Sequence, residues 1–516
     1  MTFAPHTVQI STTAGRIEGL ARDETLTFRG IPYAEPPIES RRFRPPELLR
    51  GWDGTLDATR YGACAVQSPV PGREEFFGWL NNTAPQSEAC LNLNIYAPAK
   101  STDAVPVLVY LHGGAFAFGS SSATVLDGHA LARTGKVMVV TVNHRLNIFG
   151  FLGTRRLFDT GVGTPNVGIL DLVCALRWIK AHCGSFGGDP SRITIMGQSG
   201  GAGKVAMLMK SPMAKGLFHR AIIQSTATSF HLQSPNLMEE AFSRVTEKLG
   251  AHKTSVDTLL SLGSEAILKC GNDVVASYSG FDPFRPTADG TTLPETTWLS
   301  SEVPVLIGHT SGEANFYLFH QIRSGSLTQA DILLRTCKFL KIGEDQGRHL
   351  LDAYAREFPK LSDALLFARV AGDHMFKLQS LSAADYLVDG GLDNVYAYKF
   401  SYCPSRSRPY IGAPHTIELP FVFGNLREAA NLVEDPDDAK RISDAMMECW
   451  ISFASTGSPS SEKLGNWPCF DRKSRNTMVF DRMSSVRMDP DAFERNAFSE
   501  VARYVPGSPM TFMSTG

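Results

Sequence analysis

Short runs of β-branched and aromatic residues, each followed by a glycine-rich turn, recur along the chain. Six of them cover residues 105–114, 137–145, 192–199, 221–226, 303–310 and 395–402. Their nearly continuous apolar character is typical of strands that are covered on both faces, as in a parallel sheet. Between these runs, residues 168–182, 204–210 and 352–358 show helical periodicity. The alternation predicts an α/β fold with ligands at the carboxyl ends of the strands.

The first 35 residues differ from this pattern, because β-branched residues there alternate with polar ones. We expect them to form antiparallel hairpins at one edge of a large, mostly parallel central sheet flanked by helices. No repeat, linker or shift in composition marks a boundary. The sequence therefore predicts one catalytic domain over residues 1–516, with helical insertions.

Composition excludes several classes of protein. Of 516 residues, 50 are Lys or Arg and 52 are Asp or Glu, which gives a net charge of −2. This balance argues against nucleic-acid partners and against a basic membrane-binding patch. No apolar run reaches the ~18 residues of a membrane span. The first twenty residues lack the apolar core of a signal peptide, so we expect a cytoplasmic protein; a secreted protein whose leader was removed is the alternative.

A candidate nucleophile lies in the G-x-S-x-G pattern Gly197-Gln198-Ser199-Gly200-Gly201. A predicted strand runs directly into the pattern and a predicted helix follows it, which is the context of a nucleophile elbow. Glycines there allow a sharp turn that exposes the serine hydroxyl at the edge of the sheet. A glycine-rich strand–helix turn with a capping serine is the alternative.

The same stretch partly matches a phosphate-binding P-loop, G-x-x-x-x-G-K-[ST]. Anchored on Gly203 and Lys204, that pattern needs glycine at 198 and serine or threonine at 205. The chain has Gln198 and Val205. The P-loop interpretation therefore fails at two of its four positions.

An acyl-transfer serine also needs backbone N–H groups directed at the developing negative charge. Residues 112–116, His-Gly-Gly-Ala-Phe, directly follow a predicted strand and match the loop that supplies such donors in esterases. Gly200, the residue after the serine, is expected to supply another donor. A strand-end turn in which His112 satisfies its own hydrogen bonds is the alternative.

The expected order of a catalytic triad in this type of fold is serine, acid, histidine. His415 lies in a Pro/Gly-rich loop after the predicted strand 395–402, where a catalytic base belongs. The other histidines that follow residue 313 occur in helix-like contexts: His320, His349 and His374. For the acid, Glu313 follows a predicted strand, whereas its rival Asp289 precedes a glycine and is typical of a turn.

At this point the chain resembles the type-B carboxylesterase/lipase family, the cholinesterase-like branch of the α/β-hydrolases. The resemblance runs from residue 28 to residue 470. It is carried by ordered landmarks: FRGIPYAEPP (28–37), RRFRPPE (41–47), SEACLNLNIYAP (87–98), NHRLNIFGFL (143–152), NVGILDL (166–172), WIKAHCGSFGGDP (178–190), SGEANFYLF (311–319), HTIELPFVFG (415–424), WISFASTGSP (450–459) and NWPCF (466–470).

The resemblance implies an α/β-hydrolase fold and assigns roles residue by residue. Ser199 is the implied nucleophile, Glu313 the triad acid and His415 the general base. The oxyanion donors fall on the N–H groups of Gly114, Ala115 and Gly200. No metal or organic cofactor is implied, and the partner is a small-molecule ester.

Two further pairs follow from the resemblance. The first disulfide of the family falls on Cys64 and Cys90, although two reduced thiols are the alternative in a cytosolic setting. A structural ion pair falls on Arg42 and Glu88.

The sequence departs from the family's common G-E-S-A-G and H-G-G-G motifs. Gln198 replaces a glutamate beside the serine, which removes a negative charge and disfavours hydrolysis of cationic choline esters. Gly200 stands where many members have alanine, and Ala115 where many have a third glycine. The methyl group of Ala115 is expected to crowd bulky substrates.

The loop of residues 65–89, between the two cysteines, is a candidate lid or pocket mouth. Phe76, Phe77, Trp79 and Leu80 are candidates for an apolar pocket wall, and a helix that packs them inward is the alternative.

The sequence therefore predicts a serine carboxylesterase that works through an acyl-enzyme. The alternatives are a lipase with a mobile lid or a hydrolase of carbamates, amides or lactones on the same triad. A remote third alternative is a non-catalytic binding protein with the same fold. The oligomeric state is left open.

Overall fold

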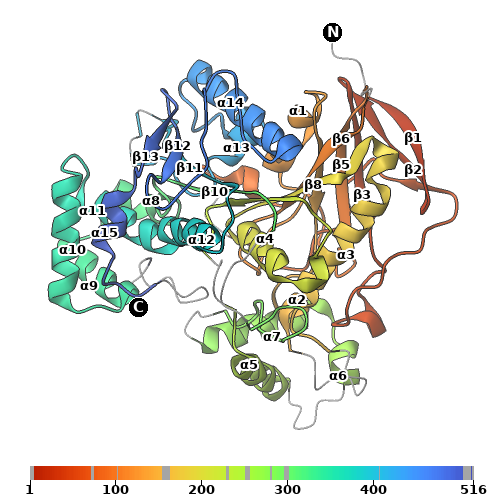
Figure 1. The fold of residues 1–516 in the computed structure, drawn as a ribbon. Helices are drawn as coiled ribbons and strands as arrows, with labels where there is room; N and C mark the ends of the chain where they lie inside the picture. The colour runs from red at the N-terminus through yellow and green to blue at the C-terminus, as the bar shows by residue number, and fades with distance from the viewer. Residues whose placement is uncertain are drawn as a thin grey trace.

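One mixed sheet of 13 strands organises the protein (Figure 1). The computed structural model describes residues 5–70, 75–100, 103–153, 163–227, 232–249, 256–278, 282–295, 302–405, 407–408, 410–503 and 513. The strands are β1 His6–Thr12, β2 Gly15–Arg22, β3 Thr25–Pro32, β4 Thr55–Asp57, β5 Asn92–Pro98, β6 Val105–Leu111, β7 Met138–Val142, β8 Gly188–Gln198, β9 Arg220–Gln224, β10 Val305–Thr310, β11 Val395–Phe400, β12 Asn476–Phe480 and β13 Ser485–Met488.

Helices connect these strands. The α-helices are α1 His129–Ala132, α2 Asn147–Phe151, α3 Val167–His182, α4 Gly200–Lys210, α5 Pro235–Lys248, α6 Val256–Ser261, α7 Ser264–Ser277, α8 Asn315–Ser324, α9 Gln329–Leu340, α10 Glu344–Glu357, α11 Asp363–Gly372, α12 Leu378–Asp389, α13 Leu419–Val422, α14 Pro436–Thr456 and α15 Ala492–Ala497. Short 3-10 helices are η1 Glu39–Arg41, η2 Gly78–Leu80, η3 Thr124–Leu126, η4 Cys183–Phe186, η5 Pro212–Ala214 and η7 Leu426–Ala429; a π-helix, Asp373–Lys377, joins α11 to α12.

The strands lie in the order β1-β2-β3-β5-β7-β6-β8-β9-β10-β11-β12-β13, and β4 pairs with β2. From β7 to β12 all neighbours are parallel, whereas the pairs from β1 to β7 are antiparallel. The predicted α/β-hydrolase fold with N-terminal hairpins is thereby confirmed. The antiparallel strand β13 at the other edge was not expected from the sequence.

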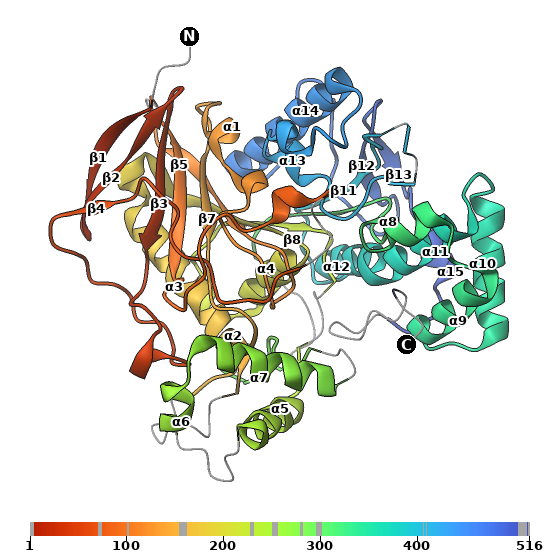
Figure 2. The same cartoon turned by 180° about the vertical axis from the view of Figure 1, so that it is seen from behind.

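Both faces of the parallel centre are covered, which explains its apolar strands. Val107 and Val109 of β6 pack in a core with residues of α3 and α4. Leu108 and Tyr110, the alternate residues of the same strand, pack in a second core with α13 and α14. Helices α5–α7 form a lobe at the bottom of both views, and α9–α11 form another on the side away from β1 (Figures 1 and 2).

The π-helix is anchored by buried charges. The ammonium of Lys377 is fully buried and lies 2.7 Å from the carboxylates of both Asp373 and Glu494. Glu494 belongs to α15, and Arg369 of α11 also contacts it at 2.7 Å. These ion pairs connect α15 to the π-helix, which borders the cavity described below.

A buried ion pair holds three segments of the N-terminal half together. The guanidinium of Arg42 donates to both carboxylate oxygens of Glu88 at 2.6 Å. It also donates to the main-chain carbonyls of Leu259, Leu260 and Leu262 at the end of α6. Both charged side chains are about nine-tenths buried. The structural ion pair implied by the family resemblance is therefore formed.

We predict that Arg42→Met lowers the free energy of unfolding by about 3–5 kcal/mol, because it leaves the Glu88 carboxylate buried without a partner. Urea unfolding of the two proteins measures the difference. Lys215→Met is the matched control: its ion pair with Glu302 is mostly exposed and should contribute at most about 1 kcal/mol. Equal losses in the two variants would contradict this assignment.

Candidate active site

Ser199 lies at a sharp turn between β8 and α4. Its backbone has φ 59° and ψ −123°, a conformation that is rare and strained for a residue with a side chain. The turn is held from both sides, since the Ser199 N–H donates to the carbonyl of Gln224 (2.8 Å) and its carbonyl accepts from Gly203 (3.1 Å). A Cβ on Gly201 would stand 2.0 Å from the carbonyl oxygen of Leu111 in β6, so only glycine fits there.

The histidine and the acid arrive from two neighbouring strands. Glu313 follows β10, and His415 lies in the loop between β11 and α13. The main-chain N–H of His415 donates to the Glu313 carbonyl at 3.3 Å. Nδ1 of His415 lies 2.5 Å from Oε2 of Glu313, and both side chains are almost fully buried. The imidazole therefore keeps its proton on Nδ1 and leaves Nε2 as the basic nitrogen.

Two further donors fix the carboxylate of Glu313. Its other oxygen accepts from the Ser225 hydroxyl and from the Thr310 N–H, each at 2.7 Å. Burial raises the pKa of this carboxyl, but the charge of His415 and these hydrogen bonds outweigh burial and lower it overall. Glu313 is therefore an ionised partner of the imidazole.

The rival acid and the other histidines lie elsewhere. The carboxylate of Asp289 accepts from the N–H groups of Thr291, Thr292 and Leu293, which is the turn that its sequence context indicated. His320 and His349 are exposed on their helices. His374 is buried in the π-helix, where it stacks on Phe498.

The predicted oxyanion loop follows β6 and packs against the start of α4. Gly114 has φ 91° and Ala115 has φ 51°. A Cβ on Gly200 would stand 2.3–2.4 Å from the oxygen, Cα and nitrogen of Ala115. Gly200 opens α4, so its N–H has no acceptor within the helix. The main chains of residues 115 and 200 are thus in contact. This contact explains why a glycine follows the serine.

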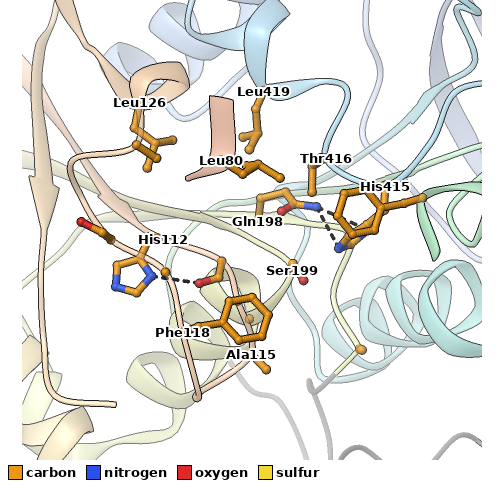
Figure 3. Close-up of a pocket in the computed structure, with 18 of the residues that line it drawn as sticks. Leu80, His112, Ala115, Phe118, Leu126, Gln198, Ser199, His415, Thr416 and Leu419 are labelled. Atoms are coloured by element: carbon orange, nitrogen blue, oxygen red, sulfur yellow. Dashed lines mark hydrogen bonds between the residues drawn. The ribbon is translucent and has the colours of Figure 1, made fainter. Parts of the chain in front are cut away.

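Ser199, His415 and the loop face one cavity of about 230 Å³ (Figure 3). Its walls are mostly apolar and aromatic. They are formed by Leu80, Tyr110, Phe118, Ala123, Leu126, Ala227, Phe316, Tyr317, Met375, Phe376 and Leu419. The Phe376 ring of the π-helix stacks on His415, with centroids 4.1 Å apart. In the described part of the chain, no carboxylate, ammonium or guanidinium lines the cavity.

Gln198 has a role that the sequence did not reveal. Its amide nitrogen lies 3.2 Å from Nε2 and 3.4 Å from Nδ1 of His415 (Figure 3). Among the described residues, Ser199 and His415 share the cavity without a hydrogen bond to each other. In enzymes without substrate such bonds are often long and form fully only in the substrate complex.

The pocket-wall expectation for the 65–89 loop is wrong for three of its four candidates. Phe76, Phe77 and Trp79 do not line the cavity; they are buried, and the ring of Phe77 packs 4.5 Å from that of Phe316. Trp79 donates its ring N–H to the Phe76 carbonyl within the loop. Leu80 of η2 lines the cavity, as expected.

The implied disulfide is not formed either: Cys64 and Cys90 are both buried free thiols. The Cys64 thiol donates to the carbonyl of Ala84 at 3.7 Å. Burial raises the pKa of both thiols, which keeps them protonated.

Comparison with known proteins agrees with this geometry. A model of the carboxylesterase family matches residues 5–497. The chain belongs to the carboxylesterase family. Para-nitrobenzyl esterase of Bacillus subtilis (strain 168) is 34% identical over 502 residues, covering 94% of this chain and 97% of that protein. Phenmedipham hydrolase of Pseudarthrobacter oxydans is 34% identical over 475 residues, covering 89% and 92%.

A solved carboxylesterase of Geobacillus stearothermophilus superimposes on this carboxylesterase with a TM-score of 0.80 and 35% identity, over 95% of this chain and 99% of that one. The protein is a carboxylic ester hydrolase of the cholinesterase-like branch. The structure contains no helix long and apolar enough to cross a membrane among its described residues.

A second buried carboxyl group of this carboxylesterase lies within electrostatic reach of Glu313. Glu418 is fully buried; one oxygen is 3.5 Å from the amide nitrogen of Gln224, and the other has no partner among the described residues. Burial and the negative charge of Glu313 raise the pKa of Glu418 to about 8. Glu418 is therefore protonated at neutral pH, whereas Glu313 is ionised.

We predict that Gly200→Ala lowers kcat about 10²–10³-fold, because the new methyl group displaces the oxyanion loop. The double exchange Ala115→Gly with Gly200→Ala, which restores the common family residues, should recover most of the activity, since glycine at 115 frees the loop to move. Gly184→Ala, at an exposed site with open space around it, is the control. Wild-type kcat in the single variant would disprove the contact.

Glu418 should make stability depend on pH. Between its unfolded pKa of ~4.3 and its folded pKa of about 8, the folded state keeps a proton that the unfolded state releases, so stability falls as pH rises. We predict that Glu418→Gln gains stability relative to wild type between about pH 5 and pH 8, on the order of a few kcal/mol.

Thermal unfolding at both pH values tests this prediction. Glu302→Gln, at an exposed carboxyl group, should show no such change. If the difference in stability between wild type and Glu418→Gln were the same at both pH values, Glu418 would not hold a proton in the folded protein.

Proposed function

We propose that Ser199, His415 and Glu313 carry out the ester hydrolysis, with N–H groups of Gly114, Ala115 and Gly200 as the oxyanion hole. His415 takes the proton of Ser199, whose Oγ attacks the ester carbonyl while the carbonyl electrons move to the oxygen. As this tetrahedral species collapses, the alcohol leaves with the proton from His415. His415 then removes a proton from water, which attacks the acyl-enzyme. As the second tetrahedral species collapses, the acid leaves and His415 returns the proton to Oγ of Ser199.

The observation that carries this proposal is the strained Ser199 elbow, which opens into the same cavity as the buried His415–Glu313 pair. Glu313 stabilises the imidazolium that forms during each proton transfer. Gln198 lies against the imidazole and adds a dipole without a charge. Positioning and electrostatics thus support acyl transfer without any group from outside these residues.

The cavity supports small, uncharged esters as the substrate class. Its volume of about 230 Å³ and its aromatic walls, including Phe118, Phe316 and Phe376, suit a short acyl chain and an aryl or small aliphatic alcohol. No charged group is among the described lining residues, so an anionic substrate group would lose its hydration there without a counter-ion.

A lipase with an apolar lid receives less support. The large side chains of the 65–89 loop that could cover a lipid substrate, Phe76, Phe77 and Trp79, are buried in the core. The rings of Phe76 and Phe77 pack against Phe319 and Phe316 of α8, and Trp79 packs against Phe77. We propose a carboxylesterase for soluble esters.

We predict that p-nitrophenyl acetate and butyrate are cleaved with a higher kcat/KM than the palmitate ester. Ser199→Ala should abolish turnover, because removing the nucleophile leaves at most a residual catalysis several powers of ten lower. A steady-state rate series over chain length, run with both proteins, gives both results. Preference for the palmitate ester above its solubility limit would favour a lipase, and full activity of Ser199→Ala would exclude the proposed nucleophile.

A further inference from the structure

Lys204 lies completely buried beneath the oxyanion loop, one turn into α4. Its ammonium donates to the main-chain carbonyl of His112 at 2.8 Å and lies 5.6 Å from the centroid of the Phe116 ring. No described carboxylate is within 4.0 Å of this nitrogen. Buried lysines are rare and normally paired with an acid. A buried lysine without an acidic partner, beside the residues that would bind a negative charge, therefore needs a functional explanation.

Two buried imidazoles complete the surroundings of Lys204. The rings of His112 and His144 stack with centroids 5.0 Å apart. Nδ1 of His112 bonds the carbonyl of Gly113 (2.9 Å), and Nδ1 of His144 bonds that of Arg145 (2.7 Å). Since a carbonyl only accepts, each Nδ1 carries the proton. Burial and the charge of Lys204 lower the pKa of His112 to about 3 and that of His144 well below its usual value.

The remaining charge near this cluster is neutralised. Arg145 donates to both carboxylate oxygens of Asp171, at 2.6 and 2.9 Å. Both histidines are neutral, so Lys204 is the group in this cluster whose charge changes near physiological pH. Burial lowers the pKa of Lys204 to about 7.

The hydrogen bond of Lys204 connects it to the site. The His112 carbonyl belongs to the peptide that begins the oxyanion loop, and Gly114 and Ala115 follow two and three residues later. An ammonium group on that carbonyl fixes the loop and polarises its first peptide. Its positive charge is also fully buried, and buried charges act more strongly than charges in water.

We propose that the ammonium form of Lys204 is a positioning residue of the oxyanion hole, holding the His112 peptide in place and supplying positive charge behind the hole as the tetrahedral oxyanion forms. This inference rests on the proposed function of Ser199 and of the loop. Lys204 does not touch the substrate; it acts through the peptide of His112. When the amine is neutral in the resting enzyme, formation of the oxyanion draws one proton from solvent onto Nζ.

The inference predicts an alkaline limb in the pH profile of kcat, along which the rate falls as Lys204 loses its proton. Lys204→Gln keeps an N–H donor for the His112 carbonyl but removes the charge, whereas Lys204→Met removes both. We expect both variants to lose the alkaline limb and to show kcat lower by about 10- to 100-fold near pH 6.5, with KM little changed.

Lys210→Gln is the matched control. It lies on the same helix about 9 Å along the axis, and burial also lowers its pKa, to about 8. It should keep the wild-type profile. An alkaline limb and a kcat equal to wild type in Lys204→Gln would overturn the proposal, because the charge would then be dispensable.

A measurement on the wild-type enzyme does not depend on how the variants fold. A trifluoromethyl ketone forms an anionic tetrahedral adduct with Ser199, whose proton moves to His415 without net uptake. Calorimetry near pH 8 in buffers of different ionisation enthalpy should therefore detect uptake of more than half a proton per site, assigned to Lys204. Binding without uptake would refute the role of Lys204. Equal binding to Ser199→Ala would instead refute the proposed nucleophile, and the role of Lys204 with it.

Discussion

The close approach of two backbones, the end of β6 and the start of α4, is the constraint on which the site depends. Gly201 leaves no room for a side chain against Leu111, and Gly200 leaves none against Ala115. This contact forces Ser199 into its strained conformation and brings the loop after β6 beside the serine. The rigid parallel centre of the sheet holds both strands and so stabilises the strain. Ser199 and the loop after β6 are thus positioned by one contact.

Near this contact, buried groups of the same type have opposite charge states, because their surroundings differ. Glu313 and Glu418 are both fully buried carboxyls, yet one is ionised because hydrogen bonds and His415 stabilise its charge, and the other is protonated because few donors reach it. Lys204 and the two histidines beneath the loop all bond main-chain carbonyls, but burial lowers the pKa of each, and the charge of Lys204 lowers those of the histidines further. Burial, neighbouring charges and hydrogen-bond partners together decide the charge of each group.

The sequence was most informative where chemistry requires a fixed order along the chain. The six apolar runs, the serine between strand and helix, and Glu313 and His415 after their strands all lie where they were expected, because parallel strands bring their carboxyl ends to one edge. The side-chain directions of Phe76, Phe77 and Trp79 were not predictable, because an apolar residue in a loop can line a pocket or pack in the core, and the sequence is the same in both cases. The contacts of Gln198, Lys204 and Glu418 were missed because they join segments up to 217 residues apart.

The π-helix between α11 and α12 has a consequence for how this fold tolerates change. Asp373–Lys377 holds one more residue per turn than the helices on either side, so it sets the angular register between them. Loss of a single residue there would rotate α12 by about 100° relative to α11. Phe376 would then turn away from His415, and Lys377 away from Glu494. Insertions and deletions in this helical segment are therefore restricted by the contacts of Phe376 with His415 and of Lys377 with Glu494.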